Sequence, residues 1–129
     1  MKTFFAFALL LTACFTTATA QAGKWELIGS KLVNYRLDID EIPVTVAKGT
    51  YTKIKIFVKG GAVNFKDIKI FYRNGQVQDV AIRSVIPAGG ESRVIDLIGN
   101  ERIITRIQLV YDTRNMAPRK ARVIILGRE

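Results

Sequence analysis

The side chains that carry most enzyme chemistry are missing from this chain. The 129-residue sequence has no histidine, and its single cysteine, Cys14, lies in an apolar amino-terminal segment. Ser-His triads, Cys-His pairs and the usual zinc sites each need an imidazole or a thiolate, so this inventory excludes them. Carboxylates, lysines, tyrosines and serines remain. We therefore predict that the protein is not an enzyme and that it holds no metal and no cofactor.

Two short segments have compositions that could still suggest a catalytic or metal site. Residues 89–92 (GGES) precede an alternating strand pattern, whereas a nucleophile elbow or a phosphate-binding loop leads into a helix. We interpret this segment as a turn. Asp38, Asp40 and Glu41 would suit a carboxylate pair or a calcium site. Solvent-facing strand ends often have the same composition, and we favour that ordinary interpretation.

Cations that alternate around aromatic rings are the strongest functional feature of the sequence. They occur in two expected strands, as Lys53, Lys55, Phe57 and Lys59, and as Lys69, Phe71 and Arg73. Side chains at every second position share one face of a strand, so each set forms a basic face that contains a ring. If both strands belong to one sheet, the seven residues form a single outer face. We predict that this face binds an anionic ligand.

The same residues allow other interpretations. Rings beside cations can stack on the sugars of an acidic glycan or insert among lipid head groups. Alternatively, Phe57 and Phe71 cover each other as a cross-strand pair, and the lysines protect the sheet against aggregation. Trp25 is either a core residue, which we favour, or an exposed platform for a sugar.

The amino-terminal segment predicts export. Lys2 precedes an apolar run over 4–11, and the small residues at 18–22 offer cleavage after Ala22 or Ala20. Such a segment is too short to remain in a membrane as a span. We predict that residues 1–22 are a cleaved signal peptide and that residues 23–129 are a single domain, periplasmic or extracellular, with no transmembrane segment.

Cys14 offers an alternative to simple cleavage. Residues 11–14 (LTAC) look like a lipobox, in which case Cys14 would become the lipidated amino terminus of a lipoprotein. The net charge is +9, or +8 without Lys2 of the leader (9 − 1). Such a charge attracts lipid head groups, acidic glycans or nucleic acid. Because an exported protein rarely meets nucleic acid, we expect no nucleic-acid partner.

Apolar residues recur at every second position of the mature chain and predict strands instead of helices. The inward-facing residues that we expect are Val33, Tyr35, Leu37 and Ile39 in one strand; Ile54, Ile56 and Val58; Ile68, Ile70 and Tyr72; and Val80 and Ile82. Apolar residues on both faces mark 103–104 and 123–126 as parts of central strands. Pro43 marks 42–46 as an edge strand or the opening of a strand, because proline cannot donate to a ladder.

Turn signals divide the expected strands. Asn74-Gly75 lies between two alternating runs and predicts a hairpin with a type I′ turn, in which both residues have positive φ. Eight or nine strands separated by turns every eight to twelve residues or so predict a β-sandwich or a small barrel.

Four segments resemble one known family. They are 25–30 (WELIGS), 86–93 (IPAGGESR), 95–97 (IDL) and 123–127 (VIILG), and they span nearly the whole mature chain. They resemble the small exported bacterial proteins known as domain of unknown function twenty-five forty-one. The resemblance implies an exported single-domain β protein and supplies no catalytic residues. Residues 102–109 and 122–127 are also similar to the last strands of galactose-binding-like jelly rolls, a likeness that transfers no ligand.

We therefore expect an all-β domain, a single jelly-roll-like β-sandwich of eight or nine mostly antiparallel strands. The expected function is non-enzymatic binding of an anionic cell-envelope component, either an acidic glycan or a lipid head group. The alternative is a structural or protein-interaction module that binds another envelope protein through an edge strand such as 42–46. A buried carboxylate pair in a cleft would instead favour an enzyme.

Overall fold

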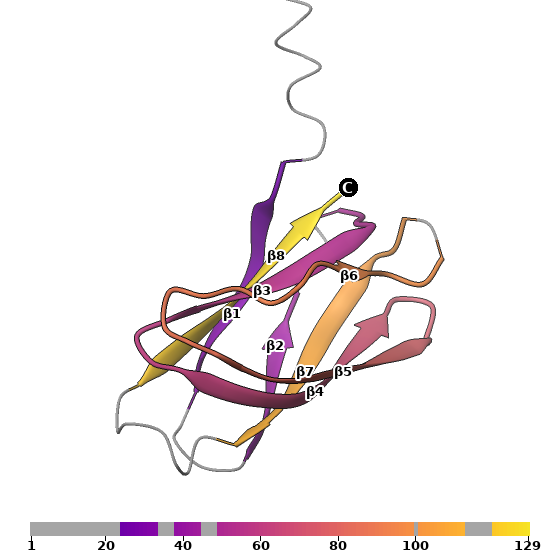
Figure 1. Cartoon of the computed structure of the whole chain (residues 1–129). Helices are drawn as coiled ribbons and strands as arrows, with labels where there is room; N and C mark the ends of the chain where they lie inside the picture. The colour runs from indigo at the N-terminus through magenta and orange to yellow at the C-terminus, as the bar shows by residue number, and fades with distance from the viewer. Residues whose placement is uncertain (1–23, 34–37, 45–48, 100, 113–119) are drawn as a thin grey trace, which may run out of the picture.

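Two four-stranded sheets pack face to face in the computed structural model, which describes residues 24–33, 38–44, 49–99, 101–112 and 120–129 (Figure 1). The strands are β1 (Glu26–Val33), β2 (Asp38–Pro43), β3 (Lys53–Lys59), β4 (Val63–Tyr72), β5 (Val77–Ile86), β6 (Ile95–Asp96), β7 (Ile104–Asp112) and β8 (Ala121–Arg128). Sheet A has the order β1-β8-β3-β6, and sheet B has the order β2-β7-β4-β5.

The strand order is that of an eight-stranded jelly roll. The chain alternates between the sheets, except that β4 and β5 are joined as a hairpin within sheet B. Every ladder that joins the named strands is antiparallel. Two interleaved sheets of this kind are the double-sheet solution by which jelly rolls bury one face of each sheet. The predicted fold class is confirmed.

The core lies between the sheets and consists of alternate residues from both. Ile54, Ile56 and Val58 of β3 are fully buried, whereas the residues between them are only half-buried. The inward positions predicted for β4 and β5 are buried as well: Ile68, Ile70, Tyr72, Val80 and Ile82. Period-two alternation therefore identified the buried face of these three strands correctly.

The predicted central and edge strands are also confirmed. β7 and β8 occupy inner positions of sheets B and A, which agrees with their apolar residues on both faces. β2 is an edge strand of sheet B, and Pro43 lies at its end. At an edge, a missing N–H donor interrupts no ladder on the open side. β2 ends at Pro43, before Val44, and residues 45–46 of the edge strand predicted over 42–46 lie outside the described residues.

The strand predicted across Val33 to Ile39 is wrong. β1 ends at Val33 in sheet A and β2 begins at Asp38 in sheet B, and the positions of Tyr35 and Leu37 lie outside the described residues. Ile39 is 58% exposed. The inward positions of β2 belong instead to Asp40 and Ile42, because the buried Tyr111 hydroxyl donates a 2.6 Å hydrogen bond to Asp40.

The hairpin between β4 and β5 is present, but its predicted turn type is wrong. Tyr72 N–H donates to the Gln76 carbonyl (2.9 Å) and Gly75 N–H donates to the Tyr72 carbonyl (3.0 Å). Gly75 has φ of +94°, whereas Arg83 is the sole described non-glycine residue with positive φ. The loop is therefore a three-residue type I turn that ends in a left-handed glycine, not a type I′ turn.

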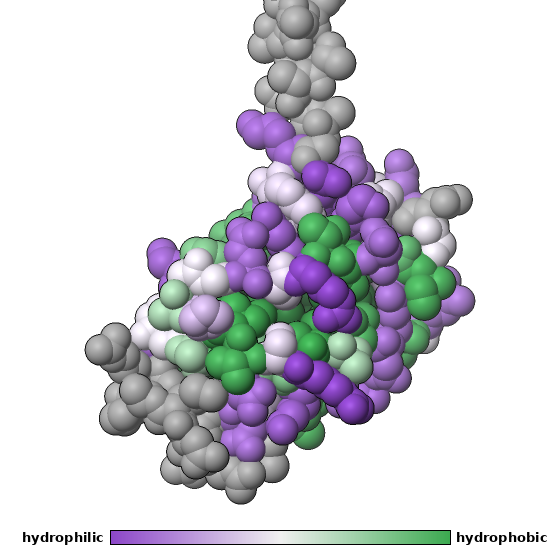
Figure 2. All heavy atoms as spheres, viewed as in Figure 1, coloured by the Kyte–Doolittle hydropathy of each residue, from purple (hydrophilic) through white to green (hydrophobic). Residues whose placement is uncertain are grey.

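Side chains bridge the side of the sandwich where edge strands β5 and β6 lie. Gln78 Nε2 donates to the Asp96 carbonyl (3.1 Å), and Arg93 Nη2 donates to the Ala81 carbonyl (3.1 Å). The connection between β5 and β6 crosses in front in Figure 1, and Figure 2 shows hydrophobic side chains in the middle of this view with hydrophilic ones around them.

The described part of the chain contains no helix with the length and hydropathy that a membrane crossing requires.

Candidate functional site

The structure divides the seven predicted binding residues between two sheets. Lys53, Lys55, Phe57 and Lys59 belong to β3 of sheet A, whereas Lys69 and Phe71 belong to β4 of sheet B and Arg73 to the turn that follows. The outer faces of the two sheets lie on opposite sides of the core. The single combined face is therefore not formed, and Phe57 and Phe71 are not a cross-strand pair.

On the outer face of sheet B, neighbouring strands already satisfy the predicted residues. Lys69 forms an ion pair with Asp79 of β5 (3.1 Å). The guanidinium of Arg106 lies 3.8 Å from the centroid of the Phe71 ring, and its Nε is 3.3 Å from a carboxylate oxygen of Glu41. Lys69 and Arg106 therefore each have an acidic partner on this face. Its charges are largely balanced within the sheet.

The outer face of sheet A keeps the four predicted residues of β3 and extends over two more strands. Directly opposite residues of an antiparallel ladder share a face. Lys53, Lys55, Phe57 and Lys59 lie opposite Arg128, Leu126, Ile124 and Arg122 of β8. Leu126 and Arg122 in turn lie opposite Leu27 and Leu32 of β1. We call these ten residues, together with Trp25, the sheet A face.

Charge on the sheet A face is unbalanced. Its cations are Lys53, Lys55, Lys59, Arg122 and Arg128, and the neighbouring edge contributes two acids, Glu91 and Asp96. The difference is +3 (5 − 2). Lys53 pairs with Asp96 at 2.8 Å and Lys55 with Glu91 at 3.3 Å. The other three cations have no carboxylate within ion-pair distance among the described residues.

Five apolar side chains of the sheet A face lie on three neighbouring strands, β1, β8 and β3. Leu27 and Leu32 are 52% and 44% exposed, although both are large hydrophobic residues. Phe57, Ile124 and Leu126 beside them are half-buried. Exposed apolar side chains beside charged groups are typical of an interaction site, because they leave apolar area in water.

Trp25 belongs to this outer surface, and the prediction that it is a core residue is wrong. The indole is half-buried, with Lys55 Nζ 4.6 Å and the Arg128 guanidinium 4.9 Å from a ring centroid. A cation this close to an indole face is attracted by the ring quadrupole. The two side chains therefore hold the ring against the end of sheet A and occupy surface that a stacked sugar would need.

The segments considered for catalysis have structural roles. Gly90 N–H donates to the Pro87 carbonyl (2.8 Å), which confirms that 89–92 begins in a turn. Ser92 exchanges hydrogen bonds with the backbone of Ile56, with its N–H donating at 2.8 Å and its Oγ accepting at 2.9 Å. Asp40 accepts from Tyr111 and Glu41 pairs with Arg106. Within the described ranges, no three or more His, Cys, Asp or Glu residues are grouped to hold a metal ion.

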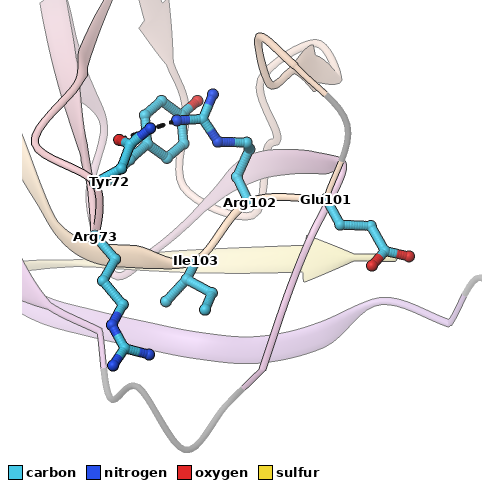
Figure 3. Close-up of a pocket in the computed structure, with 6 residues that line it drawn as sticks. Tyr72, Arg73, Glu101, Arg102 and Ile103 are labelled. Atoms are coloured by element: carbon cyan, nitrogen blue, oxygen red, sulfur yellow. Dashed lines mark hydrogen bonds between the residues drawn. The ribbon is translucent and has the colours of Figure 1, made fainter.

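A cleft that the sequence did not indicate lies where the β4–β5 turn meets the connection between β6 and β7 (Figure 3). Its volume is about 320 Å³, and it is lined by Tyr72, Arg73, Asn74, Glu101, Arg102 and Ile103. The Arg102 guanidinium lies 3.9 Å from the centroid of the Tyr72 ring. Burial raises the pKa of Tyr72 above its usual value, and the nearby positive charge of Arg102 opposes that shift.

Comparison with known proteins identifies the family. A family model described as a domain of unknown function (DUF2541) matches residues 4–127. The chain belongs to the DUF2541 family. This confirms the resemblance seen in the sequence. No curated protein matches this DUF2541 chain in sequence.

A solved structure gives a likeness of fold. The DUF2541 chain is similar to the structure of AlgX from Pseudomonas aeruginosa, with a TM-score of 0.52 and 13% sequence identity. The similarity covers 81% of this chain and 27% of the AlgX chain. At this identity the comparison supports the β architecture and transfers no residue roles.

Proposed function

We propose that this DUF2541 protein is an exported, non-enzymatic binding protein whose sheet A face binds an anionic component of the cell envelope. The observation that carries the proposal is the excess of positive charge around exposed leucines on that face. The leader supports export, and the family match begins at residue 4 and so includes the apolar run over 4–11.

The composition of the sheet A face favours a lipid head group over an acidic glycan. Its most exposed apolar side chains, Leu27 and Leu32, are aliphatic and can enter the boundary between head groups and acyl chains. A sugar site needs an accessible aromatic face, and Lys55 and Arg128 lie against the ring of Trp25. We therefore propose the surface of an anionic bilayer as the ligand.

The size of the electrostatic contribution follows from the unpaired cations. A lysine or arginine near an anionic bilayer contributes about 1 kcal/mol. Lys59, Arg122 and Arg128 have no acidic partner in the described structure, so together they contribute about 3 kcal/mol, or roughly a hundredfold in affinity. Because the screening length is about 8 Å at physiological ionic strength, this contribution should weaken with added salt.

Vesicle binding tests the proposal. The purified mature protein, with its amino terminus read by mass spectrometry, is titrated with phosphatidylglycerol vesicles, phosphatidylcholine vesicles and polygalacturonate at two salt concentrations. We expect salt-dependent binding to the anionic vesicles only. Lys59→Glu with Arg122→Glu should abolish it. Lys66→Glu with Lys69→Glu makes the same change in net charge on β4 of sheet B and should have a much smaller effect.

Other outcomes would point elsewhere. Equal losses of vesicle binding in the two double variants would show that binding depends on the net charge of the protein and not on the sheet A face. Binding to polygalacturonate alone would indicate a glycan ligand. A lipid found on Cys14 by mass spectrometry would show that the protein is a lipoprotein and that the predicted cleavage after Ala22 is wrong. Binding to neither probe would favour a protein partner. For that alternative the edge of β2 is poorly suited, because Pro43 and Glu41 hinder the addition of another strand.

A further inference from the structure

The two sides of the sheet A face differ in composition. The strand order β1-β8-β3-β6 gives the face a β1 side and a β6 side (Figure 1). Its two exposed leucines, Leu27 and Leu32, belong to β1, and Trp25 directly precedes that strand. The apolar side chains of the face that are most accessible to water therefore lie along one edge of sheet A.

Acidic side chains lie at the other edge of the same face. Asp96 belongs to β6, and Glu91 lies beside β3 in the connection that leads to β6. Both acids form ion pairs with lysines of β3. Arg122 and Arg128 of β8, which is next to β1, have no carboxylate within ion-pair distance in the described part of the chain. An anionic surface is therefore attracted most to the β1 and β8 side and repelled most at the β6 side.

The Trp25 ring suits the boundary between water and lipid. An indole combines a large apolar ring with one N–H donor, and tryptophan is enriched at that boundary for this reason. Lys55 Nζ and the Arg128 guanidinium lie 4.6 and 4.9 Å from a ring centroid. Long cationic side chains can contact apolar groups while their charged ends stay at the level of the lipid phosphates. The two cations therefore limit the depth of the ring to the head groups.

The acidic residue next to Trp25 in sequence belongs to the inner side of β1. Glu26 accepts a 2.6 Å hydrogen bond from the hydroxyl of Tyr51, which is fully buried. Glu26 lies opposite Gly127 of β8, where an added Cβ atom would lie 2.9 Å from the Tyr51 ring. The charged groups that contact the Trp25 ring are thus the two cations, and Glu26 does not oppose an anionic surface there.

On the basis of the proposed function, we infer that the domain lies tilted on the anionic bilayer, with Trp25 as its anchor. The β1 side of the sheet A face enters the head-group layer, and the β6 side is raised toward water. Trp25, Leu27 and Leu32 make the apolar contacts with the bilayer. Lys55 and Arg128 bind lipid phosphates beside the indole, and sheet B remains in water.

Fluorescence quenching tests the depth of the anchor. Trp25 is the single tryptophan of the chain, so the indole emission reports the position of this residue. The purified mature protein is titrated with phosphatidylglycerol vesicles whose acyl chains carry bromine either near the head group or near the chain end. Binding is measured separately by cosedimentation. We expect a blue shift on binding, and stronger quenching by the shallow bromines than by the deep ones.

Moving the indole tests the tilt. Trp25→Phe removes the native indole, and one further substitution supplies another: Leu32→Trp on β1, Phe57→Trp on β3 or Phe71→Trp on the outer face of sheet B. Quenching by shallow bromines should be strong in Leu32→Trp, weaker in Phe57→Trp and absent in Phe71→Trp. Phe71 is the matched control, because it is also a half-buried ring beside a cation, Arg106, but lies on the other sheet.

Loss of the ring should lower affinity. Trp25→Ala should weaken vesicle binding about tenfold while far-UV circular dichroism shows an intact fold. That factor corresponds to about 50 Å² of ring removed from water, roughly a quarter of an aromatic side chain, at about 25 cal/mol per Å². Val85→Ala removes an exposed apolar side chain from β5 of sheet B and should leave binding unchanged.

The outcomes separate the orientation from the proposed function. If the parent protein does not sediment with phosphatidylglycerol vesicles, the proposed function and the tilted orientation are both wrong. Binding without quenching of Trp25 would overturn the orientation alone. Equal quenching in Leu32→Trp and Phe57→Trp, or unchanged affinity in Trp25→Ala, would also overturn it and leave the proposed function standing.

Discussion

Gly29 offers a sharp test of how the two sheets meet. It lies in β1, directly after an irregularity in the ladder with β8. A Cβ atom at this position would lie 2.5 Å from Cγ2 of Ile42, a fully buried residue of β2 in the other sheet. Ordinary carbon–carbon contacts are near 3.5–4.0 Å. The absence of a side chain therefore lets β1 and β2 approach each other where sheet A and sheet B come together.

Gly29→Ala should destabilise the protein in spite of the better strand-forming tendency of alanine. Removing glycine from a strand gains about 0.5–1 kcal/mol, whereas overpacking a buried contact costs about 1–3 kcal/mol. We expect a net loss of about 1–2 kcal/mol in the free energy of unfolding. In a domain of about 100 residues, each kcal/mol lowers Tm by roughly 4–8 °C.

The identity of the opposing methyl group makes the prediction specific. Ile42→Leu removes the Cγ2 branch, whereas Ile42→Val keeps it. Each substitution alone should cost less than about 1.5 kcal/mol. Urea unfolding of the singles and doubles, followed by Trp25 fluorescence and far-UV circular dichroism, gives the coupling energies. Gly29→Ala should be largely rescued by Ile42→Leu and not by Ile42→Val. Full stability of Gly29→Ala, or equal rescue by both, would refute this account of the sheet contact.

Two further predictions concern stability. Ile56→Ala should cost about 2–5 kcal/mol because it opens a cavity at a fully buried site. Lys55→Ala should cost only about 1 kcal/mol, because it loses the ion pair with Glu91 and the contact with the Trp25 ring but opens no cavity in the core. Similar small costs for both variants in urea unfolding would contradict the packing of β3. Burial, and then the hydrogen bond and charge of Glu26, raise the pKa of Tyr51 well above its usual value. A raised pKa means that stability is fully present below the unfolded pKa near 10 and is lost as pH increases further. Tyr51→Phe should therefore lose less stability between about pH 9 and pH 11 than the parent protein. If the free energies of unfolding of the two proteins change in parallel over this pH range, the raised pKa of Tyr51 is disproved.

The alternation of apolar residues predicted which face of a strand is buried, but it did not predict which strands share a sheet. The buried sides of β3, β4 and β5 follow from period two alone, because that period is a property of one strand. Sheet membership depends on pairings between distant segments. β3 pairs with β8, and β4 pairs with β7, so the two basic strands lie in different sheets. The acids that neutralise Lys53 and Lys69 come from β6 and β5, and the pattern of either basic strand gives no sign of them.

The other differences have local causes. Asp40 occupies an inward position because the Tyr111 hydroxyl donates a hydrogen bond to it there. A hydropathy pattern cannot reveal a hydrogen-bond partner that comes from a strand distant in sequence. Trp25 is at the outer surface because it precedes β1 and meets Lys55 and Arg128, two cations from other strands. The cleft at Arg102 depends on two connections meeting in space. Its residues are separated in sequence and follow no motif, so the sequence alone offered no signal for it.

The positions of β7 and β8 determine when the protein can fold. These last two strands are the inner partners of β2 and β4 and of β1 and β3, respectively. While the chain emerges from its amino terminus, β1 has no ladder to join until Ala121–Arg128 has arrived, and β3 has only its short ladder with β6. Closing such distant pairings dominates the folding barrier of a β protein. Sheet A therefore assembles only after Ala121–Arg128 has been synthesised, and a chain truncated after Asp112 would retain its amino-terminal strands without the strand that unites them.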